Sequence, residues 1–199
     1  MFSSLKLLSA LSFAITASTQ ATFGNSPKRG LVFTPNIDYP EDDQIWVKSN
    51  SDITWYYNYG SQPSPQFANI PQSKFEFVPM IWGAPASTSD NEFLYNVTQL
   101  VNGGRNITHV LAFNEPDGSW QQGGSNINAT LAAQSWIREI VPLQKMGIKV
   151  GAPAMEFPGL SWLKNFTEAC QNCTFDFIPL HFYGNSHGLE WHVGEIHAA

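Results

Sequence analysis

Charged side chains are scarce in this sequence. Asp, Glu, Lys and Arg make up 13% of its 199 residues, and 16 acidic against 10 basic residues give a formal charge of −6. Lys and Arg form no cluster, so we do not expect a groove for nucleic acid, which needs grouped cations to bind phosphates. Hydrophobic residues make up 43%. This excludes an intrinsically disordered chain, whose signature is low hydrophobicity with high charge.

Several motifs of known chemistry are also absent from the sequence. It contains no Gly-Lys-Ser/Thr phosphate loop, no nucleophile elbow and no His-Glu-x-x-His zinc motif. Four histidines gather near the C-terminus, at His181, His187, His192 and His197. The last three are five residues apart, a spacing that distributes them around a helix instead of aligning them on one face. We therefore expect neither a metal site nor another cofactor.

Only one apolar run stands out, and it lies at the N-terminus. It extends from Leu7 to Ala17 behind the cationic Lys6 and leads into small residues up to Ala21. This is the pattern of a signal peptide over residues 1–21, and the run is shorter than the ~20 residues that cross a bilayer. The sequence thus predicts a secreted protein, extracellular or in a cell wall, without a membrane span. Lys28-Arg29 is either a dibasic processing site or the charged entry to a first strand.

Cysteine is rare, with two residues at Cys170 and Cys173. In an oxidising compartment this spacing favours a local disulfide, whereas the alternative of a redox centre lacks a thioredoxin-like context. Five Asn-x-Ser/Thr acceptors for N-glycosylation agree with secretion. They are Asn96, Asn106, Asn128, Asn165 and Asn172.

Short apolar runs alternate with helical patterns along the rest of the chain. The runs are nearly continuous, as in parallel strands covered on both faces, and lie at 29–33, 53–58, 75–82, 110–114, 148–153 and 175–182. Helices are expected at 91–101, 129–141, 160–170 and 188–199. Asp90 and Asn128 are placed to cap two of them, and Pro142 should end or bend the second. The Pro-rich stretch 61–71 reads as a loop. The class is therefore α/β with a parallel sheet.

The segment Asn114-Glu115-Pro116-Asp117 directly follows the strand expected at 110–114. In parallel β/α folds the functional groups lie at the carboxyl ends of strands, which places Glu115 at the mouth of the fold. Pro116 should restrict Glu115 to extended backbone geometry. A carboxyl among aromatic rings loses hydration, so its pKa should rise and it can act as a general acid. The alternative is an ordinary glutamate in a turn or an ion pair.

Other strand ends carry aromatic and polar side chains as well. Aromatic faces stack on sugar rings, and amide, imidazole and phenol groups supply directed hydrogen bonds, so the set predicts a glycan cleft. Any one of these aromatic residues taken alone would more simply be a core residue. The candidate substrate-binding residues are Trp55, Tyr57, Asn58, Trp82, Trp120, His181 and Tyr183.

Six ordered motifs carry a resemblance to a known family. They are Lys-Arg-Gly-Leu at 28–31, Trp-Tyr-Tyr-Asn at 55–58, Phe-Val-Pro-Met-Ile-Trp-Gly at 77–83, Phe-Asn-Glu-Pro-Asp at 113–117, Gly-Ala-Pro-Ala at 151–154 and Phe-Asp-Phe-Ile-Pro-Leu-His-Phe-Tyr-Gly at 175–184. The chain resembles glycoside hydrolase family 128, a mainly fungal family with an alkali-sensitive-linkage-type catalytic domain, over residues 28–199. The resemblance implies a secreted (β/α)8 TIM barrel that cleaves β-1,3-glucan with retention of configuration. It also implies that Glu115 is the acid/base and Asn114 its hydrogen-bonding neighbour.

The sequence departs from the family's pattern at the second catalytic carboxylate. A retaining mechanism needs one about 5 Å from the acid, and in the family it follows the seventh strand in a Trp-x-Thr-Glu-like segment that these 199 residues lack. Asp38 and Glu156 follow strands but have no support from the resemblance. Glu190 and Glu195 fall on the expected C-terminal helix as solvated charges.

Two functional readings follow from that departure. In the first, the chain is a hydrolase barrel truncated after about six β/α units, with little turnover alone and with unpaired strand edges that favour poor solubility or dimerisation. The second is a non-catalytic secreted β-glucan-binding protein that keeps the aromatic cleft. In both, the partner is a β-glucan polysaccharide or oligosaccharide.

Overall fold

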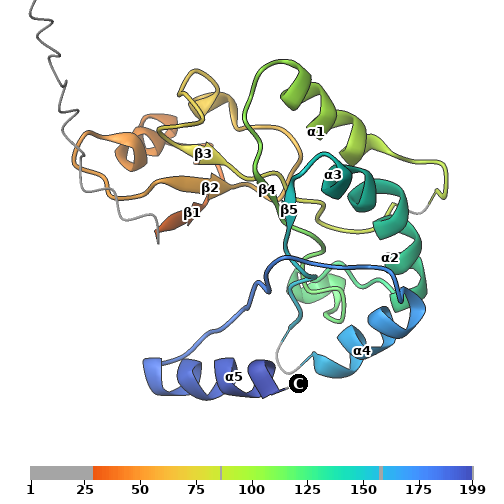
Figure 1. The fold of residues 1–199 in the computed structure, drawn as a ribbon. Coiled ribbons are helices and arrows are strands. Elements are labelled where there is room, and N and C mark those ends of the chain that lie inside the picture. Colours follow the sequence, from red (N-terminus) through yellow and green to blue (C-terminus); the bar gives the residue numbers. More distant parts are fainter. Residues whose placement is uncertain (1–28, 86, 157–158, 199) are drawn as a thin grey trace, which may run out of the picture.

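The computed structural model describes residues 29–85, 87–156 and 159–198, so the predicted signal peptide at 1–21 and Lys28 lie outside the described residues. The fold is α/β, with short parallel strands that curve past one another in Figure 1. One sheet has the order β1-β2-β3 and another pairs β4 with β5. The strands are β1 (Gly30–Val32), β2 (Trp55–Tyr57), β3 (Glu76–Phe77), β4 (His109–Val110) and β5 (Lys149–Val150).

Bridges extend this order of strands beyond the two sheets. Met80 pairs in parallel with Leu111, which links the end of β3 to β4, and Gly151 pairs with Phe177. The expected sixth strand at 175–182 is therefore reduced to one bridge, because its backbone leaves the ladder immediately after Phe177. No described strand pairs with the outer edge of β1.

The two faces of β2 point into different surroundings. Tyr56 faces outward, is 1% exposed and packs among the rings of Phe33, Phe67, Phe75 and Phe77. Burial raises the pKa of the Tyr56 phenol to about 12. Its neighbours Trp55 and Tyr57 point to the opposite, inner face, where their rings stack 6.5 Å apart.

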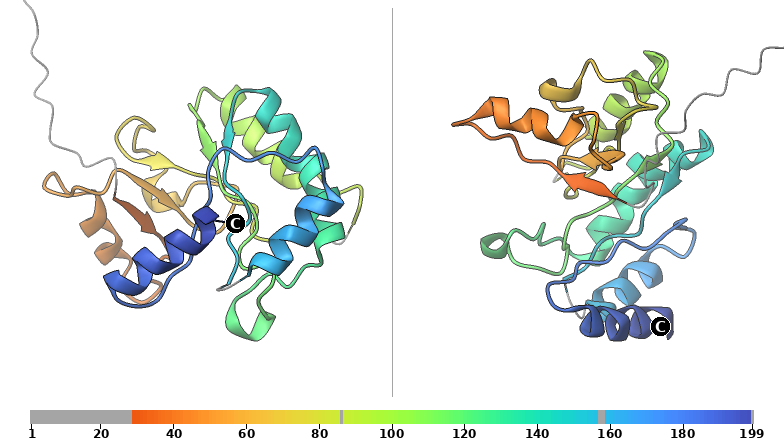
Figure 2. Two further views of the ribbon diagram at one scale, coloured as in Figure 1. Left: turned by 60° about the horizontal axis from the view of Figure 1, so that its bottom comes forward. Right: turned by 90° about the vertical axis from the view of Figure 1, so that its left-hand side faces the viewer.

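Helices α1 (Glu92–Asn102), α2 (Ala129–Ser135), α3 (Val141–Lys145) and α4 (Leu160–Ala169) line the outer side of the strands (Figures 1 and 2). The Asn128 cap predicted from sequence is confirmed, because its side chain accepts from Leu131 N–H at 2.8 Å. At α1 the N-cap position is Asn91 and not Asp90, and the Asp90 side chain, one residue earlier, accepts from Glu92 N–H at 2.9 Å. The helices bury one continuous core against the strands. Its largest members are Trp136, Ile140, Leu143, Phe113 and Phe166.

The expectation that Pro142 ends the helix was wrong. A π-helical turn, η4 (Trp136–Ile140), joins α2 to α3, and the helical chain continues to Lys145. Val141 donates to the carbonyl of Trp136, five residues back. Because proline has no N–H to give to the helix ladder, this wider turn lets the chain pass Pro142 without a break.

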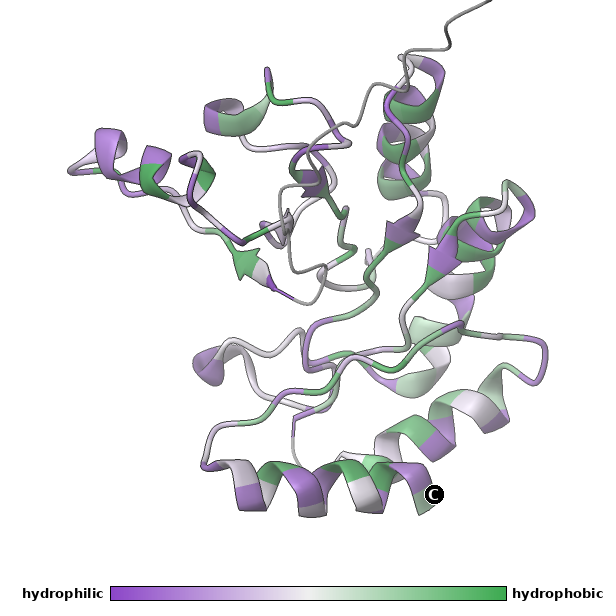
Figure 3. Ribbon diagram, turned by 60° about the vertical axis from the view of Figure 1, so that its left-hand side comes forward, coloured by the Kyte–Doolittle hydropathy of each residue, from purple (hydrophilic) through white to green (hydrophobic). Residues whose placement is uncertain are grey.

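The C-terminal helix α5 (Ser186–Ala198) stands apart from the other helices in Figure 1. Hydrophobic and hydrophilic residues are mixed along it (Figure 3), and Glu190 and Glu195 are exposed as the sequence predicts. Short 3-10 turns complete the fold at η1 (Pro40–Val47), η2 (Pro65–Phe67) and η3 (Trp120–Gln122). None of the helices in the described part of the chain has the length and apolar character to cross a membrane.

A buried carboxyl joins the helical layer together. Glu139 is fully buried in the π-helical turn, and its Oε2 accepts from the backbone N–H of Leu94 in the first turn of α1 at 3.1 Å. The Arg138 guanidinium lies 3.4 Å from the other oxygen. Burial raises the pKa of Glu139 above its ordinary value, against the lowering effects of Leu94 and Arg138.

Glu139→Gln tests this arrangement through the pH dependence of stability. Because the pKa of Glu139 is raised in the folded state, the folded protein loses stability as the pH rises from about 4.5, where an unperturbed carboxyl ionises. The variant has no such charge, so its free energy of unfolding should increase relative to that of the wild type as the pH rises above about 4.5. Urea unfolding at a series of pH values measures this difference. The control, Glu168→Gln on the exposed side of α4, should follow the wild type, and parallel curves for Glu139→Gln would contradict the interpretation.

Candidate active site

Hydrogen bonds fix the backbone on both sides of Glu115. Its N–H donates to the carbonyl of Ala154 at 2.6 Å, and its carbonyl accepts from Gly118 N–H at 2.9 Å and Ser125 N–H at 3.1 Å. The preceding Asn114 donates its N–H to the carbonyl of Trp82 and pairs with Ala154. Three segments that are far apart in the sequence thus hold Glu115 at the carboxyl end of β4.

Extended geometry at Glu115, predicted from Pro116, was wrong. The φ of Glu115 is +42°, in the left-handed region that residues other than glycine seldom occupy. The bonds to Gly118 and Ser125 close a tight turn directly after the strand, and that turn requires the unusual φ. Strained backbone of this kind persists where surrounding bonds determine it, and it is concentrated at functional sites.

The side chain of Glu115 contacts His181. Glu115 Oε1 lies 2.6 Å from His181 Nδ1, and the two side chains are 13% and 20% exposed. His181 follows the Phe177 bridge by four residues, so the resemblance motif at 175–184 brings it to the carboxyl end of β4. The contact joins imidazole and carboxyl directly, and it is partly open to solvent.

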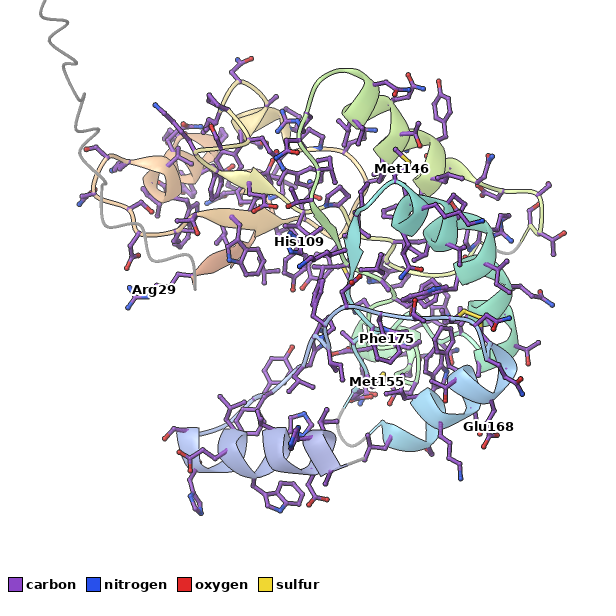
Figure 4. All side chains as sticks on the ribbon, in the orientation of Figure 1. Arg29, His109, Met146, Met155, Glu168 and Phe175 are labelled. Atoms are coloured by element: carbon purple, nitrogen blue, oxygen red, sulfur yellow. A yellow bond between two sulfur atoms is a disulfide. The ribbon has the colours of Figure 1, made fainter. Side chains whose placement is uncertain are left out.

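Two cavities meet at this pair. Glu115, Gln122, His181 and Tyr183 line both of them. The aromatic lobe, about 650 Å³, adds Tyr59, Trp82, Asn114 and Gly123. The Glu156 lobe, about 470 Å³, adds Glu156 and Phe182. Both volumes are in the range of small-ligand sites. Figure 4 labels His109, at the start of β4, and Met155, the residue before Glu156, which lies below His109 in this view.

Tyr59, Trp82 and Tyr183 are the aromatic side chains that line the aromatic lobe, and other aromatic residues lie beside them. Trp82 and Trp120 lie with ring centroids 5.3 Å apart, and Trp120 and Tyr183 are 60% and 91% exposed. Tyr57 lies beside Tyr59, 5.2 Å between centroids. Burial raises the pKa of the Tyr57 phenol well above its usual range, and neighbouring Tyr59, Tyr183 and Glu115 raise it further. Tyr57 is therefore a neutral hydrogen-bonding group at this end of β2.

Trp55 and Asn58 do not reach the two lobes. Trp55 lies two residues earlier on the inner face of β2, so it sits deeper and lines a separate cavity of about 240 Å³ with His109 and Phe177. Asn58 holds its own loop instead: its amide donates to Gln62 and Ser64, and its oxygen accepts from Gly60 N–H. The prediction that these two residues contact substrate has no support in this arrangement.

The Asn114 side chain also forms a hydrogen bond with the protein backbone. Its side chain is 5% exposed, and its amide donates to the carbonyl of Gly123 at 3.0 Å. That bond holds the 123–125 loop against the turn that begins at Glu115. In this geometry the Asn114 amide positions the turn that carries Glu115.

Two further carboxyls border the turn of Glu115. Asp117 Oδ1 accepts from the backbone N–H of Glu156 at 2.8 Å, and burial, with a smaller effect of Glu115, raises the pKa of Asp117. Gly118 lies against them, since a Cβ there would stand 3.0 Å from Glu156 Oε2. Asp38, the other carboxyl weighed from the sequence, is exposed and lines neither lobe.

The sequence reasoning did not single out Tyr59, Gln122 and Phe182, which also line the lobes. Tyr59 directly follows the motif at 55–58 and Phe182 lies within the motif at 175–184, and these positions were the available signal. Gln122 lies in η3 and carried no signal, because only the folding back of the 116–125 loop brings it to Glu115.

Some predicted features lie away from the cleft. The Cys170 and Cys173 sulfurs are bonded to each other behind α4. Among the residues that the structure describes, no group of three or more His, Cys, Asp or Glu side chains is arranged to hold a metal ion. The acceptor asparagines 106, 128, 165 and 172 are exposed, whereas Asn96 is half-buried and its amide donates to Ser61.

The comparison with known proteins identifies the family. Residues 30–199 match the family described as the glycosyl hydrolase catalytic core. The chain belongs to it, and to glycoside hydrolase family 128 within it. Alkali-sensitive linkage protein 1 of Schizosaccharomyces pombe is 35% identical over 161 residues, covering 80% of this chain and 27% of that protein. The family 128 chain thus spans about a quarter of the length of this curated relative.

Solved structures of family 128 resemble this chain closely in fold. A curdlan-specific exo-β-1,3-glucanase of subgroup III from Blastomyces gilchristii, in complex with glucose, is 26% identical with a TM-score of 0.65. That match covers 86% of this chain and 68% of the glucanase. A variant of a subgroup I endo-β-1,3-glucanase from Amycolatopsis mediterranei, in complex with laminaripentaose, is 27% identical with a TM-score of 0.60, covering 85% of this chain and 66% of that chain.

Gly124→Ala tests the close packing of the turn in this family 128 chain. A Cβ at Gly124 would lie 2.6 Å from the carbonyl carbon of Gly118 and 2.7 Å from the carbonyl oxygen of Glu115. Both are backbone atoms that other bonds hold in place, so the variant should lose about 1–3 kcal/mol of unfolding free energy in urea. Gly194→Ala in α5, where a Cβ meets nothing within 4 Å, should instead gain up to about 1 kcal/mol. Equal stability of the two variants would refute this account of the turn.

Proposed function

We propose that this chain carries the acid/base centre of a retaining β-1,3-glucan hydrolase, with Glu115 as the acid/base. The observation that carries the proposal is the position of Glu115, fixed by backbone bonds at a strand end, paired with His181 and placed between two open lobes. The names of the family 128 glucanases that this chain resembles support β-1,3-glucan as the substrate class.

The proposed chemistry proceeds in two steps. In the first, a carboxylate attacks the anomeric carbon, the glycosidic C–O bond breaks, and Glu115 gives its proton to the departing oxygen. In the second, Glu115 takes a proton from water while the water oxygen bonds to the anomeric carbon and the carboxylate ester breaks. His181 lies 2.6 Å from Glu115 and can donate its Nδ1–H to the carboxylate form or accept from the acid form, which keeps the side chain in place through both steps.

None of the described residues is placed to act as the attacking carboxylate. Asp117 is bonded to the Glu156 backbone, and Glu156 borders only one of the two lobes. We assign the attack to a Trp-x-Thr-Glu-like segment, as the family pattern has it, and the present sequence contains none. On this view residues 29–198 bind glucan and position the acid, with little turnover by themselves.

A second candidate function is glucan binding without cleavage. The observation that favours it is the aromatic lobe, which is lined by the half-buried Trp82 and the exposed Tyr183, while the exposed ring of Trp120 lies beside Trp82. Such rings need no attacking carboxylate to bind sugar. Both functions are proposed for a secreted glycoprotein. The exposed positions of four acceptor asparagines support that setting, and Asn96 should be the site without glycan because its amide nitrogen is already bonded.

Glu115→Gln separates the two functions. If Glu115 is the acid/base, the low rate of laminarin hydrolysis, measured as released reducing ends over a long incubation, should fall to the uncatalysed rate, because glutamine has no proton to give to the leaving oxygen. Laminaripentaose affinity, measured by calorimetry, should change little, since the amide keeps the size and the hydrogen bonds of the carboxyl. Glu168→Gln on the outer face of α4 is the matched control for both assays.

Each result of this test has a definite meaning. Hydrolysis at the wild-type rate in Glu115→Gln would exclude Glu115 as the acid/base. Binding by the wild type with no detectable hydrolysis in either protein would favour the binding function. A wild type that neither binds nor cleaves laminari-oligosaccharides would refute both.

A further inference from the structure

We propose that the Glu156 lobe is a subsite for one neutral glucosyl unit, and that the Glu156 carboxylate holds this unit through its hydroxyl groups. The inference rests on the proposed function, because it takes Glu115 as the point of cleavage. The two lobes share Glu115 and extend from it in different directions, one with Trp82 and one with Glu156 and Phe182. A glycosidic oxygen at Glu115 therefore places one of its two sugars in each lobe.

The backbone of Glu156 is held next to the turn of Glu115, and its side chain is exposed. Its backbone N–H donates to Asp117 Oδ1 at 2.8 Å. The buried Gly118 leaves room for its carboxylate, since a Cβ on that glycine would come within 3.0 Å of Oε2 and 3.4 Å of Glu115 Cβ. The turn that fixes Glu115 thus also sets where Glu156 stands, and the two carboxyls face one cavity from either side of Gly118.

The acceptors of Glu156 are available to a ligand. The carboxylate forms no ion pair or hydrogen bond with any side chain in the described part of the protein, and it lines a cavity of about 470 Å³. A carboxylate accepts hydrogen bonds at both oxygens, and neighbouring sugar hydroxyls are donors at matching separation. The Phe182 ring and the Gln122 amide complete the mix of one apolar face and a few polar groups that is typical of a sugar site.

The charge of the lobe selects among glycans. Glu115, Asp117 and Glu156 gather at this end of the cleft, and His181 is the one basic or imidazole side chain that lines the Glu156 lobe among the residues described. An anionic sugar such as a uronate would meet two or three carboxyls without a cation to pair with, whereas a neutral sugar offers only donors and acceptors. The lobe therefore fits neutral hexose units and disfavours uronides.

Glu156→Ala tests the inference by binding, which does not depend on turnover. Calorimetric titration with laminaripentaose, long enough to occupy both lobes, should show about tenfold weaker binding than the wild type, as expected for the loss of charge-assisted hydrogen bonds. Glu156→Gln, which keeps one acceptor oxygen, should lie between the two. Glu168→Ala is the control for removal of an exposed glutamate elsewhere. A pentamer of galacturonic acid should show no binding to the wild-type protein. Thermal melting checks that the variants fold.

The outcomes distinguish this inference from the proposed function. If the wild type binds laminaripentaose and Glu156→Ala binds it equally well, the subsite inference fails and the proposed function stands. If the wild type binds no laminari-oligosaccharide, the proposed function fails and the inference with it. Unchanged affinity together with a complete loss of hydrolysis in Glu156→Ala would make Glu156 a reacting group and overturn its role in holding sugar. Tight binding of the uronide would overturn the assignment to neutral sugars.

Discussion

The site depends on the backbone bonds that hold Glu115. A glutamate that follows a strand would normally leave the sheet with its own loop, free to adopt many orientations. Here Ala154, Gly118 and Ser125 bond its amide and carbonyl, and the backbone is held at φ +42°. Ordering a free side chain and its backbone at the moment of reaction costs free energy, so a position that folding has already fixed favours catalysis.

The same turn also positions the residues around Glu115. Gly118 and Gly124 have no Cβ, which lets the 116–125 loop fold back on itself and bring Gln122 beside Glu115. Asp117 reaches across to the backbone of Glu156. The acid, the loop that forms the floor of both lobes and the second carboxylate are therefore parts of one hydrogen-bonded unit. A change in any of its glycines should disturb all three.

The curvature of the strands decides which aromatic residues belong to the cleft. Trp55 and Tyr57 share a face of β2, yet Trp55 lines a separate cavity. Tyr57 lies near enough to Glu115 and Tyr183 for both to affect its phenol. Trp82, which lines the aromatic lobe, meets the ring of Trp120 from the 3-10 turn η3. The outer helices bury a core of large side chains and keep the strand ends in register.

The sequence by itself determined the α/β class, the parallel order of strands, the family and the position of Glu115 at a strand end, because these follow from local patterns of apolar and turn residues and from contiguous motifs. The helix cap at Asn128 was predictable for the same reason. Only the tertiary structure decided that Glu115 meets His181, that Trp55 and Asn58 stay out of the cleft, that Pro142 is passed by a π-helical turn and that Glu156 borders the site. Those facts depend on how loops distant in sequence fold against one another, and no periodicity or spacing in the chain encodes such distances.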